Sequence, residues 1–188
     1  MRSVPTCFVL GETGVGKSTF VNAITRSNEC KISYGPEACT KYCQLVKTEL
    51  ANKTIQFIDT PGLLNSYEDE ASIKEIKNEI SKHSNIQFLF ILLSFQQRIS
   101  RSLVEAIKTY KKIFPFSDFW NHVIIIYTNY YERRGNKKSE VLAALSESMK
   151  CNNIDLPPHI PIFFVDLSED REDNWRHMVE AILKNGLK

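Results

Sequence analysis

The sequence predicts an α/β fold: a mostly parallel sheet of six strands, with one antiparallel strand and helices on both faces. Short apolar runs typical of buried strands alternate with amphipathic stretches typical of helices along the 188 residues. Two neighbouring strand candidates are joined by only three residues, which indicates a hairpin and hence the antiparallel strand. A glycine-rich stretch between the first strand and the first helix has the spacing of a phosphate-binding loop. Together these observations predict a P-loop nucleotide-binding fold.

The first strand and the first helix flank the glycine-rich stretch. Residues 4–10 include the apolar segment 7–10, which is typical of a strand buried on both faces. The apolar positions within 20–24 indicate a helix that starts directly after the loop. The order strand, loop, helix is the one that a phosphate-binding loop requires.

The hairpin comes next, after a long loop over residues 26–40. Residues 42–50 alternate roughly between apolar and polar side chains, and residues 54–59 are apolar, with Ala51-Asn52-Lys53 between them. We therefore expect residues 42–50 to supply the antiparallel strand.

The remaining elements follow from periodicity. Isoleucines at helical spacing predict a surface helix over 71–84, and apolar residues on one face predict another between Ser100 and Pro115. The other elements expected are strands at 86–93, 123–127 and 160–165, a helix at 139–150 and a final helix around Val179, Ile182 and Leu183. At this length the chain is expected to form one domain over residues 1–188.

The stretch Gly11-Glu12-Thr13-Gly14-Val15-Gly16-Lys17-Ser18-Thr19 fits the pattern Gly, four residues, Gly-Lys-Ser/Thr. Its glycines allow several backbone N–H groups to face one polyphosphate. The N-terminus of the following helix favours the anion, Lys17 adds a charge for the β- and γ-phosphates, and the Ser18 hydroxyl is a ligand for Mg²⁺. The alternative, a glycine turn with a chance lysine, does not account for the flanking strand and helix.

Further polar residues follow the carboxyl ends of other strands, where ligands bind in such sheets. Asp59 ends a strand within reach of a loop-bound Mg²⁺, and Gly62 can direct its N–H to the γ-phosphate, although Asp-Thr-Pro-Gly alone is also an ordinary turn. Thr128 and Asp166 follow later strands, so both are expected at the same rim. The long loop before Thr40 is placed to sense the γ-phosphate.

Composition sets limits on other functions. The net charge of +2 provides no strong basic field, so nucleic-acid binding is not expected. The five cysteines form no CxxC pair, which favours a reduced, cytoplasmic setting. The longest apolar run, residues 88–95, is too short to span a bilayer, so membrane contact is expected only at the periphery, through a partner or through sequence not present here.

The chain resembles the immunity-associated nucleotide-binding GTPases of the AIG type, which are related to septins and to chloroplast import-receptor GTPases. Three stretches carry the resemblance: the phosphate loop with Asn22-Ala23-Ile24, Thr40 ahead of Ile58-Asp59-Thr60-Pro61-Gly62-Leu63, and Arg98-Ile99-Ser100. The last stretch resembles the Arg-aromatic-Thr box of the family, although Ile99 is not aromatic.

The resemblance implies binding of GTP or GDP with Mg²⁺, slow hydrolysis, and a homodimer across the nucleotide face. Thr40 would be the switch threonine that completes the Mg²⁺ shell, beside Ser18 and Asp59. Leu63 stands where Ras-like proteins carry a water-orienting glutamine, so intrinsic turnover should be poor. Arg98 would reach across the dimer to the partner's nucleotide; the alternative is that Arg98 is a solvated loop charge.

The resemblance also implies a purine site in two loops. In this class the base is held by Asn/Thr-Lys-x-Asp, whereas this chain has Thr128-Asn129-Tyr130-Tyr131 with Glu132 one position later. Asn129 and a tyrosine ring are expected to hold the base instead. In the last loop Asp166 or the backbone of Leu167 would meet the purine, while Ser168 could simply cap the following helix.

Two other functions use the same loop. A nucleotide-binding scaffold with negligible hydrolysis is favoured by Leu63 and by the altered base motif. A phosphotransferase such as a nucleoside kinase would need an arginine-rich lid, which the sequence does not show. The sequence therefore favours a GTP-binding switch.

Overall fold

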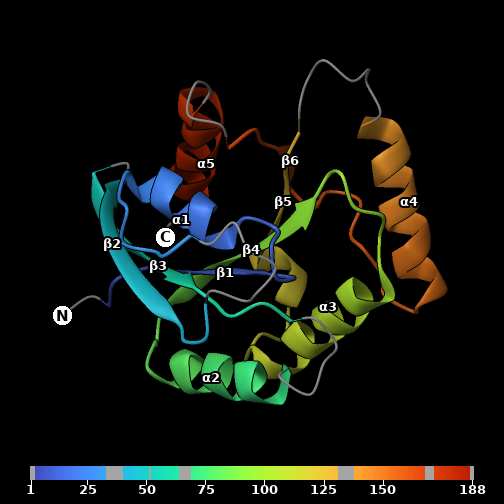
Figure 1. The fold of residues 1–188 in the computed structure, drawn as a ribbon, viewed down its shortest axis with the longest axis horizontal. Helices are drawn as coiled ribbons and strands as arrows, with labels where there is room; N and C mark the ends of the chain where they lie inside the picture. Colours follow the sequence, from blue (N-terminus) through green and yellow to red (C-terminus); the bar gives the residue numbers. More distant parts are fainter. Residues whose placement is uncertain are drawn as a thin grey trace.

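The computed structural model describes residues 3–32, 40–50, 52–63, 69–130, 138–167 and 172–186. Within them the chain forms a six-stranded sheet in the order β2-β3-β1-β4-β5-β6, with helices on both faces (Figure 1). The strands are β1 (Thr6–Gly11), β2 (Gln44–Leu50), β3 (Lys53–Asp59), β4 (Ile86–Ser94), β5 (Val123–Thr128) and β6 (Ile162–Phe164). The helices are α1 (Lys17–Thr25), α2 (Asp69–Ser81), α3 (Arg101–Ile113), the short 3₁₀ turn η1 (Phe119–His122), α4 (Lys138–Cys151) and α5 (Glu172–Gly186).

The predicted sheet is confirmed. Only β2 is antiparallel, and it pairs with β3 from Gln44 opposite Asp59 to Leu50 opposite Lys53. All other neighbouring strands run parallel. β1 lies between β3 and β4, so successive parallel strands are added on opposite sides of it. The loop after β1 therefore lies at the switch point of the sheet, where ligands bind.

Several predicted boundaries were wrong by a few residues. β2 begins at Gln44 rather than at residue 42, because β3 ends opposite Gln44 and leaves Tyr42 unpaired and 74% exposed. The strand predicted at 160–165 is only Ile162–Phe164, the three residues that pair with β5. The helix predicted at 71–84 is Asp69–Ser81; its earlier start includes Asp69 and Glu70, which suit the positive end of a helix.

The sheet separates two apolar cores. On one face α1 and α5 cover side chains such as Phe20, Phe57 and Phe90. On the other face α2, α3 and α4 cover a second set that includes Leu10, Ile58 and Tyr110. The central strands are buried on both faces, so they are apolar throughout rather than alternating.

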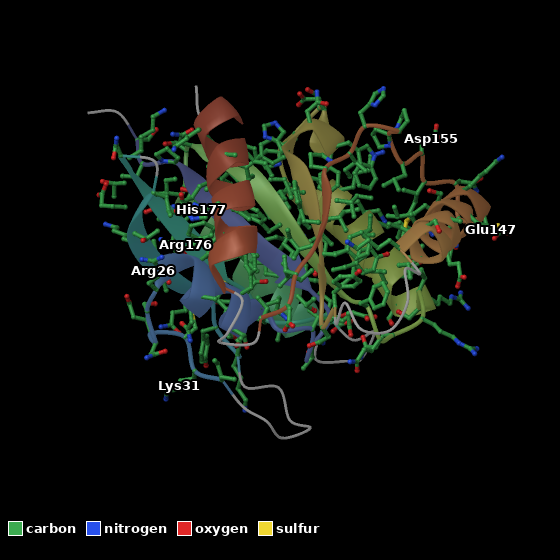
Figure 2. The ribbon with its side chains drawn as sticks, turned by 90° about the horizontal axis from the view of Figure 1, so that it is seen from above. Arg26, Lys31, Glu147, Asp155, Arg176 and His177 are labelled. Atoms are coloured by element: carbon green, nitrogen blue, oxygen red, sulfur yellow. The ribbon has the colours of Figure 1, made fainter. Side chains whose placement is uncertain are left out.

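A polar contact joins the helices of the first face. The Arg176 guanidinium on α5 donates to the backbone carbonyl of Ile24 at 3.1 Å, near the end of α1. Figure 2 labels Arg176 on α5 and Arg26, the residue that follows α1. No helix in the described ranges combines the length and the apolar character needed to cross a membrane.

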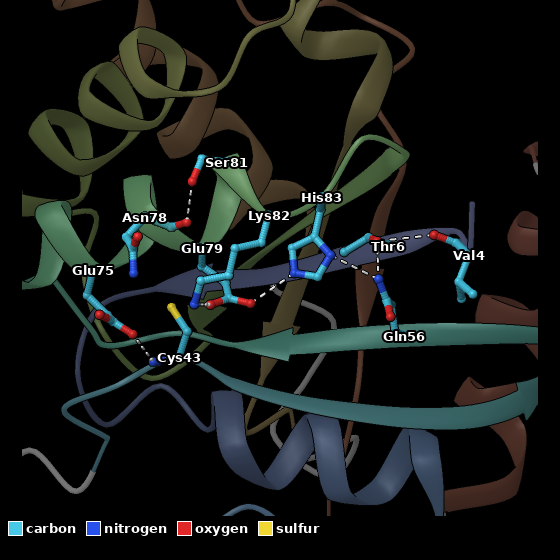
Figure 3. Close-up of polar contacts among 10 residues, drawn as sticks. All are labelled: Val4, Thr6, Cys43, Gln56, Glu75, Asn78, Glu79, Ser81, Lys82 and His83. Atoms are coloured by element: carbon cyan, nitrogen blue, oxygen red, sulfur yellow. Dashed lines mark hydrogen bonds and ion pairs between the residues drawn. The ribbon is translucent and has the colours of Figure 1, made fainter.

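A buried polar network fastens the end of α2 to the sheet (Figure 3). The Gln56 amide of β3 donates to Thr6 Oγ1 at 2.7 Å and lies 3.0 Å from Nδ1 of His83. The other ring nitrogen of His83 lies 2.9 Å from the Glu79 carboxylate, which also accepts from Lys82 at 2.7 Å. Burial alone would raise the pKa of Glu79, but these two hydrogen bonds outweigh it and leave its pKa below the ordinary value.

This network predicts a pH dependence of stability. Folding lowers the pKa of Glu79. The contribution of Glu79 to the free energy of unfolding is therefore complete above the ordinary glutamate pKa and is lost as the pH falls through the lowered pKa. We expect Glu79→Gln to reduce the free energy of unfolding at pH 7 by about 1 kcal/mol, since Lys82 is partly solvated. Urea unfolding should show that the free energy of unfolding falls less between pH 7 and pH 3 for the variant than for wild type. Glu105→Gln, which removes an exposed pair with Lys108, is the control, and an equal effect there would contradict the prediction.

Candidate functional site

The phosphate loop lies at the switch point of the sheet and leads into a helix end with free donors. α1 begins directly after Gly16, and neither a side-chain cap nor an acidic residue occupies its first turn. The first N–H groups of this helix are therefore available to an anion. Gly14 and Gly16 have φ values of 82° and 91°, which residues with a Cβ rarely adopt.

Lys17 lies within this loop. Its side chain is 6% exposed, and Nζ donates to the backbone carbonyl of Glu12 at 2.9 Å. Burial lowers the pKa of Lys17 to about 8, against the opposing charges of Asp59 and Glu12. The ammonium group is thus held at the loop by an acceptor that belongs to the loop itself.

Three hydroxyl and carboxylate side chains meet beside the loop, from three separate parts of the chain. Ser18 Oγ of α1 donates to Oδ2 of Asp59, at the end of β3, over 2.6 Å. Thr40 Oγ1 lies 3.2 Å from Ser18 Oγ and 3.5 Å from the same Asp59 oxygen. The structure therefore brings together the three residues predicted as Mg²⁺ ligands.

The chemistry of this cluster suits a magnesium ion. Asp59 is 1% exposed, and its second oxygen, Oδ1, has no hydrogen-bond partner among the described residues. Burial raises the pKa of Asp59, although hydrogen bonding from Ser18 and the charge of Lys17 oppose the shift. A buried carboxylate with an unpaired oxygen is costly unless a cation meets it. Oxygen donors are the ligands that Mg²⁺ prefers, so the residues present fit this ion.

Gly62 touches the phosphate loop. A Cβ placed on it would lie 2.3 Å from Thr13 Oγ1 and 2.5 Å from the Thr13 backbone nitrogen. Nearby, the Thr60 hydroxyl donates to the carbonyl of Val9 at 2.7 Å, which holds the turn against β1. The turn after β3 is therefore in close contact with the phosphate loop.

The predicted base loops lie on the other side of the phosphate loop. The Thr128 hydroxyl donates to the carbonyl of Val15 at 2.7 Å, so it fastens the two loops together. Asn129 has a positive φ of 56°, and its amide donates to Ser94 Oγ at 3.3 Å. Leu167 approaches the loop as well, because a Cβ on Gly16 would lie 3.4 Å from its Cδ1.

Some predicted features lie outside the described residues: residues 33–39 of the long loop, Tyr131, Glu132 and Ser168. Asp166 is half-buried and lies two residues beyond the end of β6, past the same end of the parallel strands as Asn129. Arg98 lies in the turn after β4, exposed, and makes no hydrogen bond or ion pair within the described part of the chain.

Leu63 belongs to the core rather than to the site. Its side chain is 3% exposed and packs in the cluster with Leu10 and Ile58. A glutamine here would bury its amide without a partner, so we expect Leu63→Gln to lower the free energy of unfolding by about 1–3 kcal/mol. Turnover should not increase. Urea unfolding and single-turnover hydrolysis would check this, with Leu63→Met as the apolar control; faster hydrolysis in the glutamine variant would contradict it.

Sequence reasoning missed the residues of α3 that hold the loop. The buried Tyr110 hydroxyl accepts from the backbone N–H of Gly11 at 3.2 Å. Ser100 Oγ donates to Glu12 Oε1 at 2.7 Å, and Ser102 Oγ donates to the same oxygen. In the sequence Tyr110 is one more apolar-face position in the helix predicted between Ser100 and Pro115, and Ser100 enters only as part of the Arg98-Ile99-Ser100 box, so neither residue signals a contact with the loop.

The chain is similar in sequence to known proteins of two kinds. Over 129 residues, 64% of this chain, the sequence is 34% identical to "Translocase of chloroplast 125, chloroplastic" of Physcomitrium patens. Over 127 residues, 66% of this chain, it is 31% identical to "Immune-associated nucleotide-binding protein 13" of Arabidopsis thaliana. The matched regions make up only 11% and 38% of those proteins.

Solved structures confirm the fold. Toc33 of Arabidopsis thaliana in complex with Mg²⁺ and GMPPNP superposes with a TM-score of 0.78 and 18% identity, over 99% of this chain and 85% of that one. A structure of the chloroplast translocon components atToc33 and psToc159 superposes with a TM-score of 0.70 and 19% identity, over 89% of this chain and 72% of that one. For those two proteins, dimerization is important for the GTPase activity. The AIG1 family model matches residues 6–153. Because this match extends over most of the described fold and includes the phosphate loop, Asp59 and the Arg98 turn, the chain belongs to the AIG1 family.

Proposed function

We propose that this chain is a guanine-nucleotide switch that binds GTP or GDP with Mg²⁺ and hydrolyses GTP slowly. The observation that carries the proposal is the contact of Ser18, Asp59 and Thr40 beside a helix end with free N–H donors. One residue of this cluster comes from the helix, one from a strand end and one from the loop before β2. A ligand that occupies the cluster would therefore select the positions of two loops.

The residues have distinct roles on this proposal. The backbone N–H groups of the loop and of the first turn of α1 bind the phosphates, and Lys17 adds its charge. Ser18 and Thr40 would hold Mg²⁺, with Asp59 as the buried carboxylate that orients its shell. When bound, the ion neutralises charge on the phosphate oxygens. Gly62, which lies against Thr13 of the loop, would donate its N–H to a γ-phosphate.

Slow hydrolysis follows from the burial of Leu63. An aliphatic side chain in the core cannot orient an attacking water, and no other described residue of this turn takes that place. The catalytic group that Leu63 cannot supply can come from a second copy of this chain. Arg98 is exposed and unpaired in the described part of the chain, and dimerization is important for the GTPase activity of the structurally similar atToc33 and psToc159. We therefore include a homodimer across the nucleotide face, with Arg98 reaching the partner's nucleotide.

Guanine is the proposed base. The similar Toc33 structures contain GDP or GMPPNP. Asn129 and Asp166 at the rim supply an amide and a carboxylate on the side of the phosphate loop where the base would lie. Leu167 beside Gly16 supplies apolar contact.

The test combines binding and assembly. Calorimetry should show tight binding of GDP and GMPPNP with Mg²⁺, and much weaker binding of the corresponding adenine nucleotides. Sedimentation should show dimers with GMPPNP and monomers with GDP. Arg98→Ala should leave nucleotide affinity within about twofold and reduce dimer-stimulated hydrolysis by about tenfold or more, as expected for an arginine acting in trans. Equal affinity for adenine nucleotides, or equal sedimentation in both states, would contradict the proposal.

A second function is favoured by one observation. Because Leu63 is buried, a chain in which Arg98 does not act in trans would bind nucleotide with negligible hydrolysis and serve as an assembly scaffold. Single-turnover hydrolysis at protein concentrations below and above the dimerization range separates the two. A rate that stays negligible in the dimer supports the scaffold.

A further inference from the structure

The segment that carries Arg98 is fixed at both ends. Residues 95–100 connect β4 to α3. At the first end the backbone N–H of Phe95 donates to the carbonyl of Thr128 at 2.9 Å. The Phe95 ring packs edge-on against Tyr130, with centroids 5.1 Å apart, and against Phe164 at 5.9 Å. This end of the segment is therefore attached to the loop expected to hold the base.

The other end is attached to the phosphate loop. Ser100 caps α3, where its hydroxyl accepts from the N–H of Leu103 at 3.0 Å. The same hydroxyl donates to the Glu12 carboxylate at 2.7 Å, and Ser102 donates to the same oxygen of Glu12. The two serine hydroxyls lie 2.8 Å apart, so one carboxylate oxygen binds both the cap residue and the second residue of the helix.

Glu12 also contacts the phosphate-binding lysine. Its backbone carbonyl accepts from Lys17 Nζ while its carboxylate reaches α3. The preceding residue, Gly11, donates its N–H to Tyr110 on the same helix. Two adjacent loop residues therefore contact α3, Glu12 at its start and Gly11 at Tyr110 near its end.

We infer that Glu12, Ser100 and Ser102 form a brace that makes the position of Arg98 depend on the nucleotide in the phosphate loop. The inference rests on the proposed function, because it assigns Glu12 and Ser102 as positioning residues for an arginine that acts on a second copy. Arg98 itself has no side-chain partner in the described ranges, so only the backbone of its segment directs it. Fixing both ends of a six-residue segment lowers the entropic cost of ordering it at the interface.

The sharpest probe is Ser102→Ala. It removes one donor of the brace and leaves the cap of α3, which belongs to Ser100, in place. Ser139→Ala is the matched control, because Ser139 is likewise the second residue of its helix, α4, and is exposed. Glu12→Gln keeps an acceptor oxygen and should retain most of the brace, whereas Glu12→Ala removes it.

Hydrogen exchange tests the brace itself. In wild type, Mg²⁺-GMPPNP should slow exchange of the amides in residues 95–103, measured below the concentration at which dimers form. Ser102→Ala and Glu12→Ala should reduce this protection by about tenfold, while Ser139→Ala and Glu12→Gln should keep most of it. Equal protection in Ser102→Ala and wild type would overturn the inference.

Assembly provides the second measurement. Ser102→Ala should raise the protein concentration for half-maximal stimulation of hydrolysis by about five- to tenfold, with nucleotide affinity nearly unchanged. Combined with Arg98→Ala it should add nothing, since both changes remove the same contribution. Additive losses would overturn the inference.

The two proposals fail in different ways. If wild type neither binds guanine nucleotide nor dimerizes, the proposed function is wrong, and the brace is then tested by exchange in the nucleotide-free protein. There Ser102→Ala should speed exchange over residues 95–103 relative to Ser139→Ala. If wild type dimerizes and Arg98→Ala abolishes stimulation while Ser102→Ala has no effect, only the brace is wrong.

Discussion

Replacing Lys17 by alanine is expected to abolish tight binding of Mg²⁺-nucleotide, with a loss of about 100-fold or more in affinity, as for a truncated buried charge partner. Lys17 is 6% exposed and is held at the loop by the Glu12 carbonyl, so on the proposed function its charge would act on the phosphates with little screening by water. Calorimetry with GDP and with GMPPNP measures the effect directly.

Two further variants make this result specific. Lys77→Ala removes an exposed lysine of α2 and should leave affinity unchanged. Ser18→Asn should weaken binding strongly only when Mg²⁺ is present, because Ser18 contacts Asp59 in the cluster that fits the ion. Wild-type affinity in Lys17→Ala would show that the phosphates bind elsewhere.

The second large effect is expected for Gly62→Ala. The added Cβ would lie within 2.7 Å of three Thr13 atoms, two of them in the backbone, so the turn after β3 must move away from the phosphate loop. We expect GDP affinity to change little and GMPPNP affinity to fall by about tenfold or more, as for the loss of a charge-assisted hydrogen bond to the γ-phosphate.

The ratio of the two affinities is the internal control for Gly62→Ala, because a general loss of folding lowers both. Thermal unfolding of the variant should remain cooperative. An unchanged ratio of GDP to GMPPNP affinity would show that Gly62 does not sense the γ-phosphate, even though it touches the loop. Dimers formed with GMPPNP in this variant would lead to the same conclusion.

The fold was predictable because its signals are local. Apolar strand runs, one short hairpin connection and the glycine pattern each involve only neighbouring residues, and the six-stranded sheet follows from their order. Element ends were less accurate, since a strand ends where its partner ends. Tyr42 has a strand-like residue type but lies beyond the last pair with β3.

The site was predictable in part. Spacing located Lys17 and Ser18, and a strand end located Asp59, because parallel strands direct their carboxyl ends to one rim. The position of Leu63 in the core was not predictable, since the sequence shows only an apolar residue after a turn. The role of Thr128 in holding Val15 also required the structure, because the two residues are 113 positions apart.

The sequence by itself determined the class of the fold, the glycine-rich loop and which hydroxyl and carboxylate residues are candidates beside it, because these depend on residue types at short spacing. Only the tertiary structure decided that Glu12 extends to Ser100 and Ser102, that Gly62 rests on Thr13, and that Asp59 keeps one oxygen unpaired. The physical reason is that hydrogen bonds and close contacts depend on ångström distances between segments far apart in the chain, and no local pattern of residues encodes those distances.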